Sequence, residues 1–143
     1  MRASASTIDF DVARSATGAW DFMIGSQSLA QRLGKHERLE VEGPQGLVSA
    51  LGTVPGTKSR LLLESEPDLT AGATALLVCA VCGGYDGGPI GARVERHGDI
   101  VVWRDLGYYP DVGDDGPALF DRVTSFAFEW EQYRGVLATV SVS

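Results

Sequence analysis

The chain has 143 residues, a length typical of one domain that buries its own hydrophobic core. Hydrophobic residues make up 44% and charged residues 22% of it, which excludes a wholly disordered chain. The formal net charge of −7 argues against non-specific nucleic-acid binding, which depends on clustered Lys and Arg, and suits a basic protein partner.

The first ten residues, MRASASTIDF, lack the apolar run of a secretory signal. No apolar run approaches the roughly 20 residues of a membrane-spanning helix. We therefore expect a cytoplasmic protein, monomeric or homodimeric, with no nucleic-acid or membrane partner. In a reducing compartment its two cysteines are thiols, metal ligands or a transient redox pair rather than a permanent disulfide.

The N-terminal part predicts two strands and a short helix. Residues 1–6 are small and polar and form a frayed end. Apolar and acidic residues alternate over residues 7–13, which predicts a half-buried strand, and residues 19–25 predict a second. A helix then starts after Ser28, because Gln31 three residues later completes a capping box. Gly34 marks the expected end of this helix.

Strands dominate the rest of the chain. Three short ones are expected at residues 38–43, 46–52 and 59–65, and an apolar run predicts a strand covered on both faces at residues 75–81. Two further strands flank His97-Gly98 as a hairpin. After a single helical turn at Pro117, residues 125–130 predict a strand and residues 131–140 a helix. The sum is one α+β domain over residues 1–143, mainly antiparallel sheet, with two or more short helices on one face.

Cys79 and Cys82 end the apolar strand as a C-x-x-C pair followed by two glycines. This layout is that of half a zinc site, in which a tight turn brings two thiolates within tetrahedral distance. A redox pair is less favoured, because no helix follows to lower a thiol pKa. The third interpretation is that both cysteines are small buried hydrophobes. We expect no cofactor, and zinc is the alternative.

The other ligands of such a zinc site are hard to find. His36 and His97 are the two histidines, and His97 lies at the far tip of the predicted hairpin, roughly 23 Å from the pair by strand geometry. Asp86 is closer in sequence. Two chains that each contribute Cys79 and Cys82 would also complete a four-thiolate site at a dimer interface.

The segments VCAVCGG, ARVERHGDIVVWRDLGYY and FAFEWEQYRGVL resemble a group of small bacterial, largely actinobacterial, proteins of uncharacterised activity. Their shared core reads V-C-x-x-C-G followed by V-V-W-R-D. In that group C-x-x-C-G-D is followed shortly by a third cysteine. Here Gly84 and the run from Asp86 to Gly88 occupy that region without a cysteine. The resemblance therefore implies a shared domain, and the missing third cysteine, a departure from the family pattern, argues against a three-thiolate metal site in this chain.

A second candidate site is a binding surface of aromatic and charged residues at the end of the second hairpin strand: Trp103, Arg104, Asp105, Tyr108 and Tyr109. Aromatic residues and Arg are enriched in binding hot spots. The alternative is ordinary strand alternation, in which Val101 and Trp103 point one way while Arg104 pairs with a carboxylate on the other face.

The sequence carries no catalytic signature. It has neither a phosphate-binding GxxxxGK[ST] loop nor a G-x-S-x-G elbow, and we assign no catalytic residue. A paired-carboxylate enzyme stays open, since 19 acidic residues allow many pairs. We favour a small acidic, non-enzymatic binding protein, for example one that neutralises a basic protein. The alternative is a zinc or thiol redox protein that depends on Cys79 and Cys82.

Overall fold

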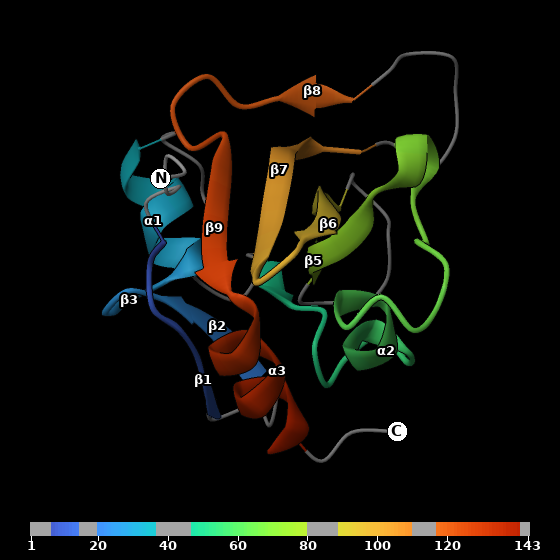
Figure 1. Cartoon of the computed structure of the whole chain (residues 1–143). Coiled ribbons are helices and arrows are strands. Elements are labelled where there is room, and N and C mark those ends of the chain that lie inside the picture. The colour runs from blue at the N-terminus through green and yellow to red at the C-terminus, as the bar shows by residue number, and fades with distance from the viewer. Residues whose placement is uncertain (1–6, 15–19, 37–46, 80–88, 110–116, 141–143) are drawn as a thin grey trace.

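The computed structural model describes residues 7–14, 20–36, 47–79, 89–109 and 117–140. These residues form one three-stranded and one six-stranded antiparallel sheet together with three α-helices, which confirms the α+β class (Figure 1). The expected strand at residues 38–43 lies outside the described residues. No helix in the described part of the chain has both the length and the apolar character needed to cross a membrane.

The smaller sheet is formed by β1 (Phe10–Arg14), β2 (Trp20–Ile24) and β3 (Gln27–Ser28). Both longer strands were predicted, β1 from its alternation, and they turn Phe10 and Phe22 into the core. β3 leads directly into α1 (Leu29–His36). The smaller sheet thus brings one helix and a pair of aromatic rings to the core.

The capping box at the start of α1 is confirmed. The backbone N–H of Gln31 donates to the Ser28 hydroxyl over 3.1 Å, and the Ser28 N–H donates to the Gln31 side chain over 3.3 Å. The expected end at Gly34 is wrong, because the helix continues to His36 and Gly34 does not have a positive φ. A glycine weakens a helix by about 1 kcal/mol but does not end it unless the chain turns left-handed there.

The larger sheet has the order β4 (Leu47–Ser49), β5 (Thr74–Cys79), β6 (Ile90–His97) and β7 (Ile100–Tyr108). The predicted apolar strand is β5, and its residues from Thr74 to Val78 are buried, as a strand covered on both faces should be. β6 and β7 form the predicted hairpin, with His97 paired to Ile100 across the Gly98-Asp99 turn.

Two strands pair with β7 along the edge that faces away from β6. β9 (Ser125–Glu129) pairs with its first half, and β8 (Ala118–Leu119) pairs with Gly107 and Tyr108 in its second half. The helical turn expected at Pro117 is wrong, since β8 starts there instead. The reason is a backbone ladder: Ala118 and Leu119 find partners on β7, which a single helical turn would leave unpaired.

The two sheets enclose one core. The N–H of Ile8 donates to the carbonyl of Ala127 in β9, and the N–H of Trp20 donates to the carbonyl of Leu51 just after β4, both over 2.9 Å. Backbone hydrogen bonds therefore connect the N-terminal part of the chain to the larger sheet at β9 and next to β4. The helix α3 (Trp130–Ala138), predicted at residues 131–140, follows β9 and buries Trp130, Tyr133 and Leu137.

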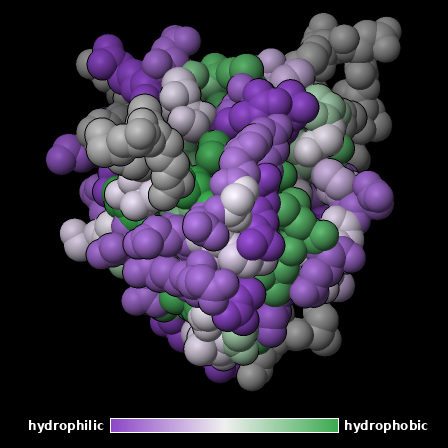
Figure 2. Space-filling model, in the orientation of Figure 1, coloured by the Kyte–Doolittle hydropathy of each residue, from purple (hydrophilic) through white to green (hydrophobic). Residues whose placement is uncertain are grey.

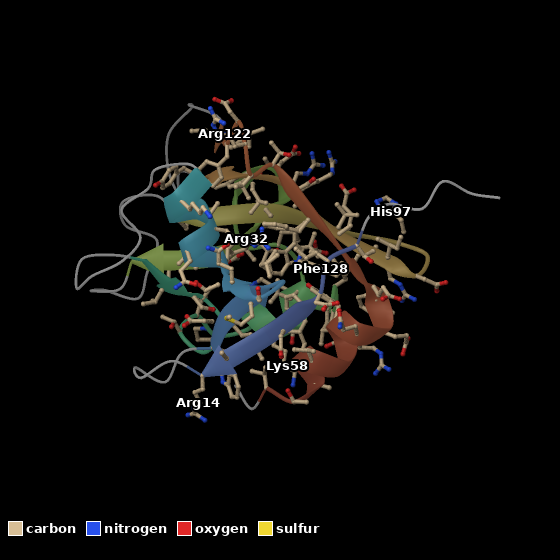
Figure 3. All side chains as sticks on the ribbon, turned by 90° about the vertical axis from the view of Figure 1, so that its left-hand side faces the viewer. Arg14, Arg32, Lys58, His97, Arg122 and Phe128 are labelled. Atoms are coloured by element: carbon tan, nitrogen blue, oxygen red, sulfur yellow. The ribbon has the colours of Figure 1, made fainter. Side chains whose placement is uncertain are left out.

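Aromatic rings fill the centre of this core. The Trp103 indole meets Phe22 and Phe128 edge to face, with centroids 5.2 and 5.1 Å apart. Phe10 lies 4.7 Å from the ring of Tyr133, which joins β1 to α3. Figure 3 shows Phe128 among the side chains in the interior. These rings are contributed by both sheets and one helix, so the core depends on the whole fold.

The predicted strand at residues 59–65 is wrong. A five-residue helix, α2 (Thr57–Leu61), begins there and is followed by a tight turn. The three leucines at positions 61–63 fit either a strand or a helix, and only tertiary packing decides between them. Leu61 is fully buried and Leu62 packs against the core, whereas Leu63 is exposed. A short 3-10 turn, η1 (Thr70–Gly72), then leads to β5.

Candidate functional site

The cysteine pair stays a prediction. Cys79 is the last residue of β5, as expected, but its side chain and the whole of Cys82 lie outside the described residues, as does Asp86. The side chain of His36 is also not described. Among the described residues, no group of three or more His, Cys, Asp and Glu side chains is placed to hold a metal ion.

His97 lies at the tip of the β6–β7 hairpin, as its sequence position predicts (Figure 3). Its side chain is exposed, and Nε2 lies 3.2 Å from the Glu95 carboxylate. The hairpin extends away from the β5 end that carries Cys79, because β5 and β6 are antiparallel and pair near Ile90. His97 is therefore placed to interact with its own hairpin.

The structure divides the predicted aromatic surface between core and exterior. Trp103 and Tyr109 are fully buried, so neither side chain is available to a partner. Arg104, Asp105 and Tyr108 are partly exposed. The alternation of β7 explains this result, since Trp103 shares the inward face with Val101. Arg104 points outward and donates to Glu95 over 2.7 Å, the pairing that the alternative interpretation expected.

Four residues on the outer side of β6 and β7 form a connected set of charges, here called the β6–β7 charge network: Arg93, Glu95, Arg104 and Asp105. The Asp105 carboxylate lies 3.5 Å from the Arg93 guanidinium and 3.3 Å from that of Arg104. The hydrogen bond from Arg104 holds the pKa of Glu95 below its ordinary value. All four charges are therefore satisfied within the chain.

Asp105 occupies a β-bulge with a left-handed backbone, φ 56°. Arg93 pairs with Arg104 and Gly91 with Gly107, so β7 has one residue more than β6 between these pairs. The bulge falls where the edge of β7 changes partner from β9 to β8. The Tyr109 hydroxyl donates to the Asp105 carbonyl and holds this backbone in place.

A second feature is the turn after α2. The N–H of Glu64 donates to the carbonyl of Ser59 over 2.8 Å, and the N–H of Leu63 donates to the carbonyl of Arg60 over 3.1 Å. These two bonds define a Schellman motif whose left-handed position is Leu63, with φ 63°. Glycine is the usual residue there, because a side chain in this conformation costs about 1–2 kcal/mol. The Leu63 side chain is nevertheless present and 44% exposed.

Three acidic residues follow this leucine along the chain. We call residues 63–68 (LESEPD) the acidic loop. Glu64 and Glu66 are exposed, while Asp68 fixes the far end of the loop by accepting the Ala75 N–H over 3.0 Å. The Arg60 guanidinium lies 3.7 Å from Asp68 and connects that end to α2. The loop thus presents an exposed apolar side chain followed in sequence by two exposed carboxylates.

The acidic loop differs from the rest of the described surface in its charge. The described residues contain twelve acidic and ten basic side chains, so their charges nearly balance. Figure 2 shows that hydrophilic and hydrophobic residues are interleaved on one face. Three acidic residues within five positions, as at residues 64–68, occur nowhere else in the described ranges. The loop is their densest concentration of negative charge.

Sequence reasoning missed the acidic loop because it assigned residues 59–65 to a strand. The hydrophobic pattern of SRLLLES is compatible with a strand, and no glycine marks the left-handed position. The usable signal was the Glu-x-Glu-Pro run that follows, since proline and charged residues interrupt strands. Comparisons of the chain with family models, with curated proteins and with solved structures find no match. The resemblance to actinobacterial proteins stays an expectation.

Proposed function

We propose that the chain is a non-enzymatic cytoplasmic binding protein that docks a basic protein partner at the acidic loop. The observation that carries the proposal is Leu63, a large apolar side chain that is 44% exposed in a left-handed backbone and is followed along the chain by the exposed Glu64 and Glu66. Backbone strain of this kind concentrates at binding and catalytic sites. Loops on a rigid scaffold are also where binding residues gather.

Stability alone does not account for Leu63. Its neighbours Leu61 and Leu62 contribute to the core cluster, whereas Leu63 lies outside that cluster and leaves 44% of its surface exposed despite its strained backbone. Glycine at this position relieves the strain and keeps both hydrogen bonds of the Schellman motif. Where a strained residue serves binding, relieving it raises stability and lowers function, a trade-off that the variants below measure.

The charges of the loop favour a basic partner. Glu64 and Glu66 are exposed, so a Lys or Arg of the partner reaches them without displacing an internal bond. The net charge of −7 extends the attraction over a longer range and raises the association rate at low salt. The same charge opposes nucleic acid. Leu63 then supplies the apolar anchor that electrostatic steering alone lacks.

The test is affinity capture from a lysate of the source organism with the wild-type chain and two variants of the loop. Leu63→Gly removes the anchor and relieves the backbone, so its binding falls while its stability rises. Glu64→Gln with Glu66→Gln removes the two charges and keeps the side-chain shapes. We expect the wild type to retain one or more basic proteins, identified by mass spectrometry, and both variants to lose at least about tenfold of that signal.

Two matched controls make the result specific. Leu119→Ala removes the other exposed large hydrophobic side chain of the described residues, and Ala71→Gly relaxes another left-handed residue. Both retain the basic protein if the acidic loop is the site. Retention of no basic protein by the wild type contradicts the proposal. So does a loss with Leu119→Ala as large as that with Leu63→Gly.

A further inference from the structure

We draw no further inference here: the strongest candidate, the partly exposed apolar patch of Val48, Val54 and Leu69 that packs on the small second core of Ala50, Ala75 and Val78 at β4 and β5, carries none because nothing in the described part of the chain shows what covers it.

Discussion

The indole Nε1 of Trp103 donates a hydrogen bond of 3.1 Å to the Tyr133 hydroxyl, which itself donates to the carbonyl of Leu61 over 2.7 Å. This buried relay connects β7, α3 and α2, three elements far apart in the sequence. Burial raises the pKa of Tyr133 well above its ordinary value, so the hydroxyl stays neutral and available as a donor. The relay fixes α2, and with it the acidic loop, to the aromatic core.

Tyr133→Phe is expected to destabilise the fold by about 2–3 kcal/mol, because the Trp103 N–H and the Leu61 carbonyl both lose their buried partner. Urea denaturation measures the change in the free energy of unfolding. Tyr108→Phe is the control, since the Tyr108 hydroxyl makes no hydrogen bond with a described residue, and it should cost less than about 0.5 kcal/mol. A cost for Tyr133→Phe no larger than for Tyr108→Phe would show that the relay is not formed.

Leu63→Gly is expected to stabilise the protein by about 1 kcal/mol, since it relieves a left-handed backbone and removes a side chain that lies outside the core cluster. For a chain of this size the melting temperature should rise by about 3 °C. Thermal unfolding followed by circular dichroism measures it. Leu63→Ala keeps a Cβ in the same conformation and should leave the melting temperature nearly unchanged. A loss of stability in Leu63→Gly would mean that the leucine contributes packing.

Much of the fold could be predicted because its signals are local. Alternation of apolar residues located β1 and the β6–β7 hairpin, and the Ser28 capping box located the start of α1. The strand predicted at residues 59–65 was wrong, because three consecutive leucines are as compatible with a helix as with a strand. The structure decides between them through the burial of Leu61, a tertiary contact that no local pattern contains.

The candidate site was harder to predict than the fold. Trp103, Arg104 and Tyr109 have the composition of a hot spot, but composition does not distinguish a surface from a core. The alternation of β7 correctly predicted that Trp103 points inward and that Arg104 pairs with a carboxylate on the other face. Nothing in the sequence placed Asp105 in a bulge or Leu63 in a left-handed turn, because both conformations depend on how distant strands and helices meet.

The cysteine pair is tested by metal content and thiol accessibility. We expect no bound metal in freshly purified protein, and two thiols that react only after denaturation, as for buried hydrophobic cysteines. Inductively coupled plasma mass spectrometry measures the metal content, and thiol titration before and after denaturation measures the accessibility of the cysteines. About one zinc per chain, with thiols shielded until a chelator is added, would establish the alternative zinc site. One zinc per two chains would place it between two copies.

Two glycines should respond in opposite ways to alanine. A Cβ at Gly107 would lie 2.4 Å from the carbonyl oxygen of Ala118, a backbone atom that moves only if β8 leaves the sheet. Gly107→Ala should therefore cost about 2–4 kcal/mol. A Cβ at Gly135 meets nothing within 4 Å, and this helical glycine should gain about 0.5–1 kcal/mol as alanine. Chemical denaturation of both variants compares them, and a tolerated Gly107→Ala would contradict the close approach of β8.

Two acidic groups should give opposite changes of stability with pH. The pKa of Glu95 is lowered from 4.5, chiefly by its hydrogen bond from Arg104, so its favourable contribution is full above pH 4.5 and is lost as the pH falls through the lowered pKa. The pKa of Asp21 is raised from 3.8 by burial. Its ionised form is therefore disfavoured in the folded state, and this unfavourable contribution disappears as the pH falls below 3.8.

The variants Glu95→Gln and Asp21→Asn separate the two contributions. At pH 7 Glu95→Gln should lower and Asp21→Asn should raise the free energy of unfolding, each by at most about 0.5 kcal/mol because both side chains contact solvent. Near pH 3 the Asp21→Asn difference should vanish and the Glu95→Gln difference should shrink, since protonation then removes the charges that distinguish the variants from the wild type. Urea titrations at both pH values measure the differences. A rise in the free energy of unfolding for Glu95→Gln at pH 7 would mean that Arg104 does not hold Glu95 in solution.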